Sequence, residues 1–177
     1  GLIKDLSNVK TISLEGEGNY LCIVGKSNNH LGNSKFMTII QKKEDGGTPI
    51  INLDEELANG HFVLELINKQ LVMSSHDVGE GGILIAVAEM CITGNLGLTI
   101  DEDKEFSHRF YFGENQSRYL IEIKQENFEQ IKQLAKSKNI SFEKLGEVNQ
   151  ENIRINKSNI IKVSELKRNY EQGISEI

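Results

Sequence analysis

The chain has 177 residues, a formal net charge of −6 and 38% hydrophobic residues. This length suits one domain that buries a core without disulfides or metals. The sequence has no Lys/Arg-rich run, so nucleic acid and anionic membrane are not indicated as partners. No apolar stretch reaches the roughly 18 residues of a membrane span, and residues 1–5 do not resemble a signal peptide. The acidic total still permits a phosphorylated ligand, because backbone amides bind phosphate without basic side chains.

Cys22 and Cys91 both lie inside apolar runs. Two widely spaced cysteines make neither a disulfide framework nor a metal site. We therefore expect both to be buried, reduced thiols of a cytoplasmic protein.

In the first half, the β-prone runs 11–14 and 20–24 predict a hairpin or an adjacent strand pair, and a polar loop follows over 25–36. A helix is expected to begin at 52, with acids in its first turn where the helix dipole favours them. Residues 71–74 are expected to form a short strand. The apolar residues of the helix recur at helical spacing and predict one buried face: Leu53, Leu57, Val63, Leu64, Ile67 and Leu71.

In the second half, an apolar run over 83–92 predicts a central helix that ends at Gly94-Asn95. The remaining runs predict strands over 96–101, 110–112, 119–123, 142–148, 153–155 and 160–163, and helices over 126–138 and 164–170. Interleaved strands and helices indicate an α/β (α+β) layered domain with a mixed β-sheet packed by helices. We expect residues 1–177 to be this single domain.

The glycine loop Ser75-His76-Asp77-Val78-Gly79-Glu80-Gly81-Gly82 lies between a predicted strand and the apolar helix. Glycines allow close approach of a ligand, and free N–H groups at a helix start attract phosphate. On this interpretation the phosphate- or ligand-binding residues are His76, Asp77, Gly79, Gly81 and Gly82. The alternative is a tight strand–helix joint capped by Asp77 or Glu80, with His76 as a structural hydrogen-bonding residue. The loop is neither a Walker loop nor a dinucleotide fingerprint.

A second polar run, Glu114-Asn115-Gln116-Ser117-Arg118, lies between two predicted strands. Glu114, Gln116 and Ser117 are candidates for polar contacts to a sugar hydroxyl or an amide, and the alternative is a simple hairpin turn.

The remaining polar clusters indicate no chemistry. We interpret the acids at 101, 102, 103 and 105 as a solvated loop rather than a Mg²⁺ site. His30, His61 and His108 have no ligand spacing and are expected at the surface. The sequence predicts no catalytic residue and no metal ligand of its own.

Taken in order, several segments resemble the formylglycinamide ribonucleotide synthetase family. Residues 75–83 followed by Ala86-Val87-Ala88-Glu89-Met90 resemble the family's A-H-D-V-S-D-G-G-L and A-L-A-E-M. Residues 113–119 are similar to its S-E-S-Q-S-R-F, and Leu145-Gly146-Glu147-Val148 to its I-G-E-V. Residues 25–34 resemble its G-x-T-x-x-E-L-G-G-S, so the resemblance covers essentially the whole chain. Gly79 and Asn115 each stand where the family usually has Ser.

The resemblance implies an aminoimidazole ribonucleotide synthetase C-terminal-like fold, as the second C-terminal-type domain of a longer synthetase. That family converts formylglycinamide ribonucleotide, ATP and glutamine-derived ammonia to the amidine in de novo purine biosynthesis. ATP and Mg²⁺ would then belong to the full-length enzyme, and the domain alone would be inactive. Implied partners are an upstream ATP-binding domain, a glutaminase subunit and a small bridging subunit. The alternative is an interaction or scaffold module of a related kinase or synthetase, without catalytic residues of its own.

Overall fold

A computed structural model describes residues 5–100, 107–155 and 159–175. The strands in this part of the chain are β1 (Tyr20–Val24), β2 (Ser75–Asp77), β3 (Gly97–Ile100), β4 (Tyr119–Ile123), β5 (Phe142–Asn149), β6 (Asn152–Arg154) and β7 (Ile160–Lys162). They form one sheet in the order β2-β4-β1-β5-β3-β6-β7. The β3–β6 pair is parallel and the other pairs are antiparallel, which confirms the predicted mixed sheet.

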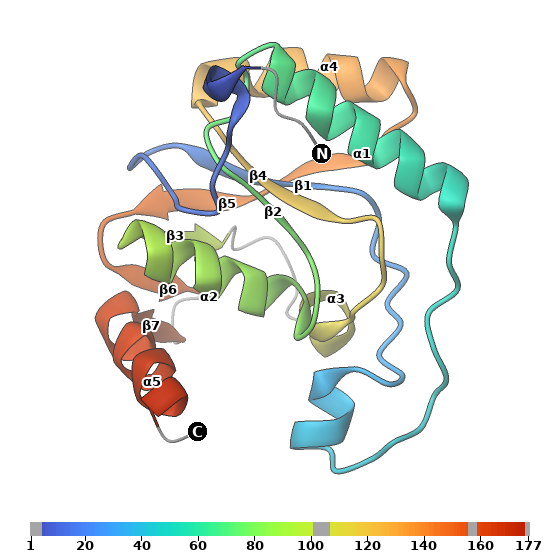
Figure 1. Ribbon diagram of the computed structural model, residues 1–177, viewed down its shortest axis with the longest axis vertical. Helices are drawn as coiled ribbons and strands as arrows, with labels where there is room; N and C mark the ends of the chain where they lie inside the picture. Colours follow the sequence, from blue (N-terminus) through green and yellow to red (C-terminus); the bar gives the residue numbers. More distant parts are fainter. Residues whose placement is uncertain (1–4, 101–106, 156–158, 176–177) are drawn as a thin grey trace.

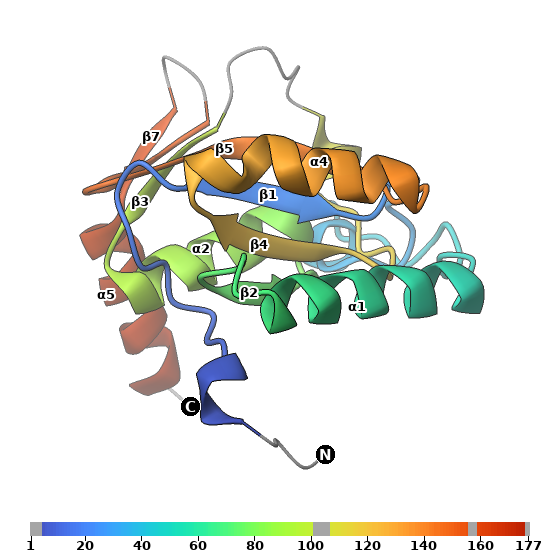
Figure 2. The ribbon, with the colours of Figure 1, turned by 90° about the horizontal axis from the view of Figure 1, so that it is seen from above.

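Helices cover both faces of the sheet. They are α1 (Leu53–Asn68), α2 (Gly82–Gly94), α3 (His108–Phe112), α4 (Phe128–Ser137) and α5 (Val163–Ser175), with short helical turns η1 (Leu6–Asn8), η2 (Phe36–Ile40) and η3 (Gln125–Asn127). Figures 1 and 2 show α1 and α4 on one side of the sheet and α2 and α5 on the other. The domain therefore has three layers, which agrees with the predicted layered arrangement of a sheet packed by helices.

Strand alternation divides the core into two clusters. In β1, Leu21 and Ile23 join the cluster around α2, whereas Cys22 and Val24 join the cluster under α1 and α4. Cys91 of α2 is fully buried, and burial raises the pKa of its thiol to about 12. Both cysteines are buried thiols outside any disulfide, as expected.

The ends of α1 and α2 follow from local sequence. The side chain of Asn52 caps α1 by accepting a hydrogen bond from the Glu55 N–H at 3.2 Å. The expected end of α2 is confirmed, because Asn95 takes the left-handed conformation and its N–H donates to the Cys91 carbonyl.

Two strand predictions in the first half are wrong. Residues 11–14 form no strand, and β1 pairs instead with β4 and β5, which are distant in sequence. Residues 71–74 are not a strand either, and the paired segment is displaced to Ser75–Asp77. The backbone of Met73 already donates to the Glu122 carbonyl, so this run approaches β4 before regular pairing begins.

The aromatic run 110–112 was predicted as a strand and belongs to helix α3. Its β propensity is overridden by packing: Tyr111 is buried in the core, and Phe112 stacks on Phe36 at 5.0 Å between ring centroids. Glu114 to Arg118 therefore connects a helix to β4 rather than two strands.

The predicted buried face of α1 is wrong in part: Val63 is buried and Ile67 and Leu71 pack against the core as predicted, but the three other leucines do not. Leu53, Leu57 and Leu64 are exposed, whereas Phe62, Val63 and Leu66 are buried. Asn59 is buried as well, because its amide donates to the carbonyl and hydroxyl of Ser117, both at 2.9 Å. This polar contact sets a rotation of the helix that counting apolar residues does not reveal.

The remaining surface predictions concern three histidines and one acidic run. His61 and His108 are exposed, and His30 is partly exposed. The acidic run predicted as a solvated loop, 101–105, lies outside the described residues.

Candidate functional site

The glycine loop, the 114–118 segment and the start of α1 enclose a hollow of about 580 Å³. A smaller hollow of about 250 Å³ adjoins it and shares Gln116 and Ser117. The structure thus brings the two sequence-predicted segments together. The larger hollow is lined by Ile51, Leu53, Glu56, Asp77, Val78, Gly79, Glu80, Glu114, Gln116, Ser117, Arg118 and Tyr119.

The side chain of Glu114 lies at the start of α2. Its carboxylate accepts hydrogen bonds from the N–H of Gly81 at 2.8 Å and from the N–H of Lys35 at 2.6 Å. A helix start favours an anion. Here a carboxylate of the chain itself takes that position, beside the place where the sequence suggested phosphate.

Arg118 is a buried cation beneath the hollow, with 1% of its surface exposed. Its Nε donates to the Asn115 carbonyl at 3.0 Å and its Nη2 donates to the Gly113 carbonyl at 2.6 Å. Burial lowers the pKa of the guanidinium to about 10, and the charge of Glu114 opposes that shift. Arg118 therefore fixes the 113–118 segment from within.

His76 points away from the hollow. Its Nε2 lies 2.9 Å from a Glu89 carboxylate oxygen on α2, and its Nδ1 lies 3.4 Å from Asp77. It lines instead a separate hollow of about 130 Å³ that Tyr170 of α5 also borders. His76 therefore ties β2 to α2, which agrees with the structural alternative raised from the sequence.

The three glycines of the loop differ in role. Gly82 has φ +75°, and a Cβ there would lie 2.7 Å from the Tyr111 carbonyl oxygen and 2.8 Å from that of Gly113. Gly81 has φ +81° and is buried. Gly79 is open, because nothing lies within 4 Å of a Cβ built there. Of the five loop candidates, only Asp77 and Gly79 line the hollow.

Among the residues of the hollow that sequence reasoning missed are Tyr119 and Glu56. The Tyr119 hydroxyl donates to a Glu56 carboxylate oxygen at 2.8 Å, which joins β4 to the first turn of α1. Burial, and then the neighbouring Glu56, raise the pKa of Tyr119 to about 12. Tyr119 is an aromatic residue at the start of a predicted strand, and this was a signal for it. Its hydrogen bond to Glu56 depends on tertiary structure and cannot be predicted from the sequence.

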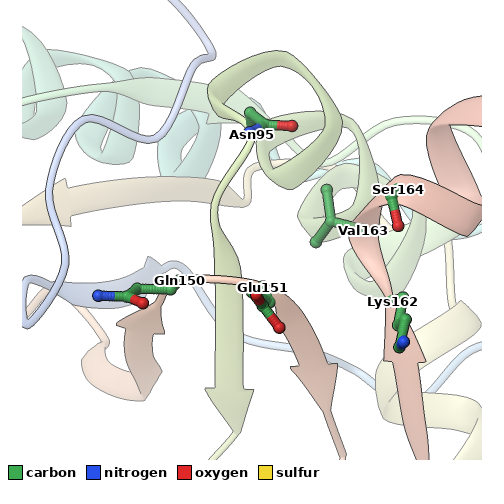
Figure 3. Close-up of a pocket in the computed structure, with 6 residues that line it drawn as sticks. All are labelled: Asn95, Gln150, Glu151, Lys162, Val163 and Ser164. Carbon is green, nitrogen blue, oxygen red and sulfur yellow. The ribbon is translucent and has the colours of Figure 1, made fainter.

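A further hollow of about 290 Å³ lies at the other end of the sheet and contains none of the predicted residues. Figure 3 shows Asn95 at the end of α2 across from Gln150 and Glu151, with Lys162 and Ser164 on β7 and α5.

Within residues 5–100, 107–155 and 159–175, no cluster of three or more His, Cys, Asp or Glu side chains has a metal-binding arrangement. None of the helices in the same ranges combines the length and apolar composition needed to cross a membrane.

Fold and site together define an α+β domain whose glycine loop opens a buried helix beside a polar hollow. The family "AIR synthase related protein, C-terminal domain" matches residues 16–156. The chain belongs to this family.

Its relatives include much longer proteins. It is 37% identical over 168 residues to the phosphoribosylformylglycinamidine synthase subunit PurL of Pelagibacter ubique, covering 94% of this chain and 23% of that protein. It is 35% identical over 167 residues to the PurL subunit of Alkaliphilus metalliredigens, covering 93% and 23%. The chain thus spans about a quarter of the length of these relatives.

Solved structures share the fold. PurLQS from Thermotoga maritima superposes with a TM-score of 0.71 at 17% identity, covering 92% of this chain and 28% of that chain. T. maritima PurL complexed with ATP gives 0.68 at 19% identity, covering 92% and 28%. A thiamine-monophosphate kinase from Stenotrophomonas maltophilia gives 0.52 at 14% identity, covering 79% and 50%.

Proposed function

We propose that this chain is the second C-terminal-type domain of a cytoplasmic, ATP-dependent ligase of purine biosynthesis. The enzyme would convert formylglycinamide ribonucleotide, ATP and glutamine-derived ammonia to formylglycinamidine ribonucleotide. The observation that carries the proposal is the 37% identity with a PurL subunit over 94% of this chain. Because the chain matches 23% of that subunit, the reaction requires further domains.

The domain would meet a ligand in the hollow between the glycine loop and residues 114–119. Asp77, Gln116 and Ser117 offer polar groups, and Gly79 leaves its backbone open to close approach. His76, Gly81 and Gly82 would shape the loop without touching the ligand. The carboxylates of Glu56, Asp77, Glu80 and Glu114 surround the hollow, so a neutral part of a ligand, such as sugar hydroxyls or an amide, suits it better than a phosphate.

We place no nucleotide triphosphate with Mg²⁺ in this hollow. Glu114 already accepts the Gly81 N–H, and the ammonium of Lys35 is paired with Glu80 at 3.4 Å. We therefore assign ATP and Mg²⁺ to the upstream ATP-binding domain of a full-length enzyme. A glutaminase subunit would supply the ammonia, and a small bridging subunit would be a further partner.

A second candidate is a scaffold module of a related kinase or synthetase. The observation that favours it is again Glu114, because an internal carboxylate at the start of α2 replaces an external anion. In both cases the 177-residue chain alone should form no amidine.

A chimera separates these possibilities. The aligned segment of the Pelagibacter subunit would be replaced by this chain, and the purified chimera assayed for amidine formation with ATP and an ammonium salt. We expect turnover, and a folded chimera without activity beside an active parent would contradict the ligase proposal.

Site variants of the chimera then test the hollow. The double substitution Gln116→Ala with Asp77→Asn should raise the KM for the ribonucleotide about tenfold, because the ligand loses a few polar contacts. Gln150→Ala in the distant hollow is the matched control. If the double variant and the control have the same KM, the hollow binds no part of the ribonucleotide.

A further inference from the structure

Helix α1 carries a line of leucines on the side that faces away from the sheet. Leu53, Leu57 and Leu64 are 74%, 59% and 53% exposed. At 100° per residue they fall within an arc of roughly 40° and extend over about 16 Å of helix. The buried residues Phe62 and Leu66 point to the opposite side. The helix is thus apolar on two sides, and only one is covered within the described residues.

The line continues into the segment before the helix. Ile50 is 90% exposed and Ile51 is 58% exposed. Single exposed apolar residues are ordinary on a protein surface, but a contiguous row marks an interaction surface. We name Ile50, Ile51, Leu53, Leu57 and Leu64 the α1 stripe.

Negative charge surrounds the N-terminal end of the α1 stripe. Asp54 is exposed beside it, and Glu55 and Glu56 complete an acidic first turn. Asp77, whose side chain is 78% exposed, lies at the hollow that Ile51 and Leu53 also line.

Lys26 borders the smaller hollow together with Ile50 and Glu55, and three other lysines near this helix are paired with other acids. Lys35 pairs with Glu80 at 3.4 Å. At the far end of the helix, Lys69 and Lys138 both pair with Glu65, at 2.8 and 3.0 Å. The N-terminal end of the α1 stripe therefore keeps an excess of acid, which a basic partner would complement.

We propose that the α1 stripe binds a basic amphipathic helix of a partner protein. Its apolar side chains would recur every three or four residues, and its Lys or Arg side chains would meet Asp54 and Asp77. A straight row of side chains on one helix forms a ridge, and such a ridge packs into a groove on the surface of a second helix. A second copy of this chain is a poorer occupant, because two bodies of net charge −6 repel one another. The proposal does not require the reaction proposed above, and the two share Ile51, Leu53 and Asp77 at the hollow.

The test uses two synthetic helical peptides with the same leucine row, one flanked by Lys and the other by Glu. Fluorescence anisotropy with the 177-residue protein should show at least tenfold tighter binding of the Lys peptide, weakened in about 1 M salt. Amide NMR shifts should centre on 50–64. The double substitution Leu57→Ser with Leu64→Ser leaves every charge in place and should weaken binding at least tenfold.

A matched control is Ile40→Ser, since Ile40 is 63% exposed on η2, outside the α1 stripe. Thermal melting verifies that each variant is folded. Equal affinity for both peptides, absent binding, or an unaffected double variant would overturn the proposal. Sedimentation showing a dimer that the double substitution dissolves would assign the stripe to a second copy and overturn it as well.

Discussion

Replacing Arg118 with methionine tests whether this residue organises the hollow. Arg118→Met keeps a long side chain in the cavity but removes every guanidinium donor. The carbonyls of Gly113 and Asn115 then lose the hydrogen bonds now made at 2.6 and 3.0 Å. The segment that presents Gln116 and Ser117 to the hollow would lose its internal anchor.

The magnitude follows from two opposing effects. Each hydrogen bond from a charged donor contributes about 1.5–3 kcal/mol, so losing both costs about 3–6 kcal/mol. The variant no longer buries a charge, and the lowering of the Arg118 pKa to about 10 places that relief on the order of 3 kcal/mol. The net loss in the free energy of unfolding is therefore centred on about 1.5 kcal/mol.

Urea unfolding followed by circular dichroism measures this difference, provided that the dependence on urea concentration stays constant between variants. Arg109→Met is the matched control, because Arg109 is exposed and reaches the Asn29 carbonyl only at 3.4 Å. We expect the control to change stability by less than about 0.5 kcal/mol. An equally small loss for Arg118→Met would refute the anchoring role.

Three further predictions concern the glycine loop and α2. Gly82→Ala should cost at least about 2 kcal/mol in urea unfolding, because its Cβ would meet backbone oxygens at φ +75°, whereas Gly79→Ala should be nearly neutral; equal effects would contradict this. Glu114→Gln should enlarge sulfate-induced amide shifts over 77–83, because the anion competing for the start of α2 is neutralised; unchanged shifts would count against it. The pKa of Cys91, raised to about 12, means that the unfolded thiol ionises first as pH rises. Stability should therefore fall above about pH 9 by up to about 1.4 kcal/mol per pH unit more in the wild type than in Cys91→Ala; parallel pH profiles would exclude this.

Local sequence was sufficient where a pattern repeats within one element. The apolar run of α2, its Asn95 cap and the amphipathic α4 all follow from spacing that a reader can count along the chain. The mixed sheet likewise followed from the number and order of β-prone runs. The glycine loop and the 114–118 run were both identified, and the structure places them around one hollow.

Sequence patterns failed where a polar residue decides the packing. Glu122 lies inside a β-prone run, yet it is fully buried and accepts hydrogen bonds from the N–H groups of Glu15 and Gly16 and from the side chains of Asn19 and Ser74. These partners hold 15–19 against β4 as a loop. A buried carboxylate needs such donors, but its partners lie about 50 to 107 residues away in the sequence. No local pattern reveals them.

Glu114 shows how a single side chain changes what a glycine loop can do. This loop has two features that favour an anion: a helix start and backbone N–H groups beside glycines. The Glu114 carboxylate occupies the position of such an anion by accepting the Gly81 N–H. The same oxygen also accepts the Lys35 N–H, so it joins residues near η2 to α2. The charge that would have been brought by a ligand is thus supplied by the chain. In our proposal this leaves Asp77, Gln116 and Ser117 as the groups available to a ligand, which favours neutral hydroxyl or amide groups in the hollow over phosphate.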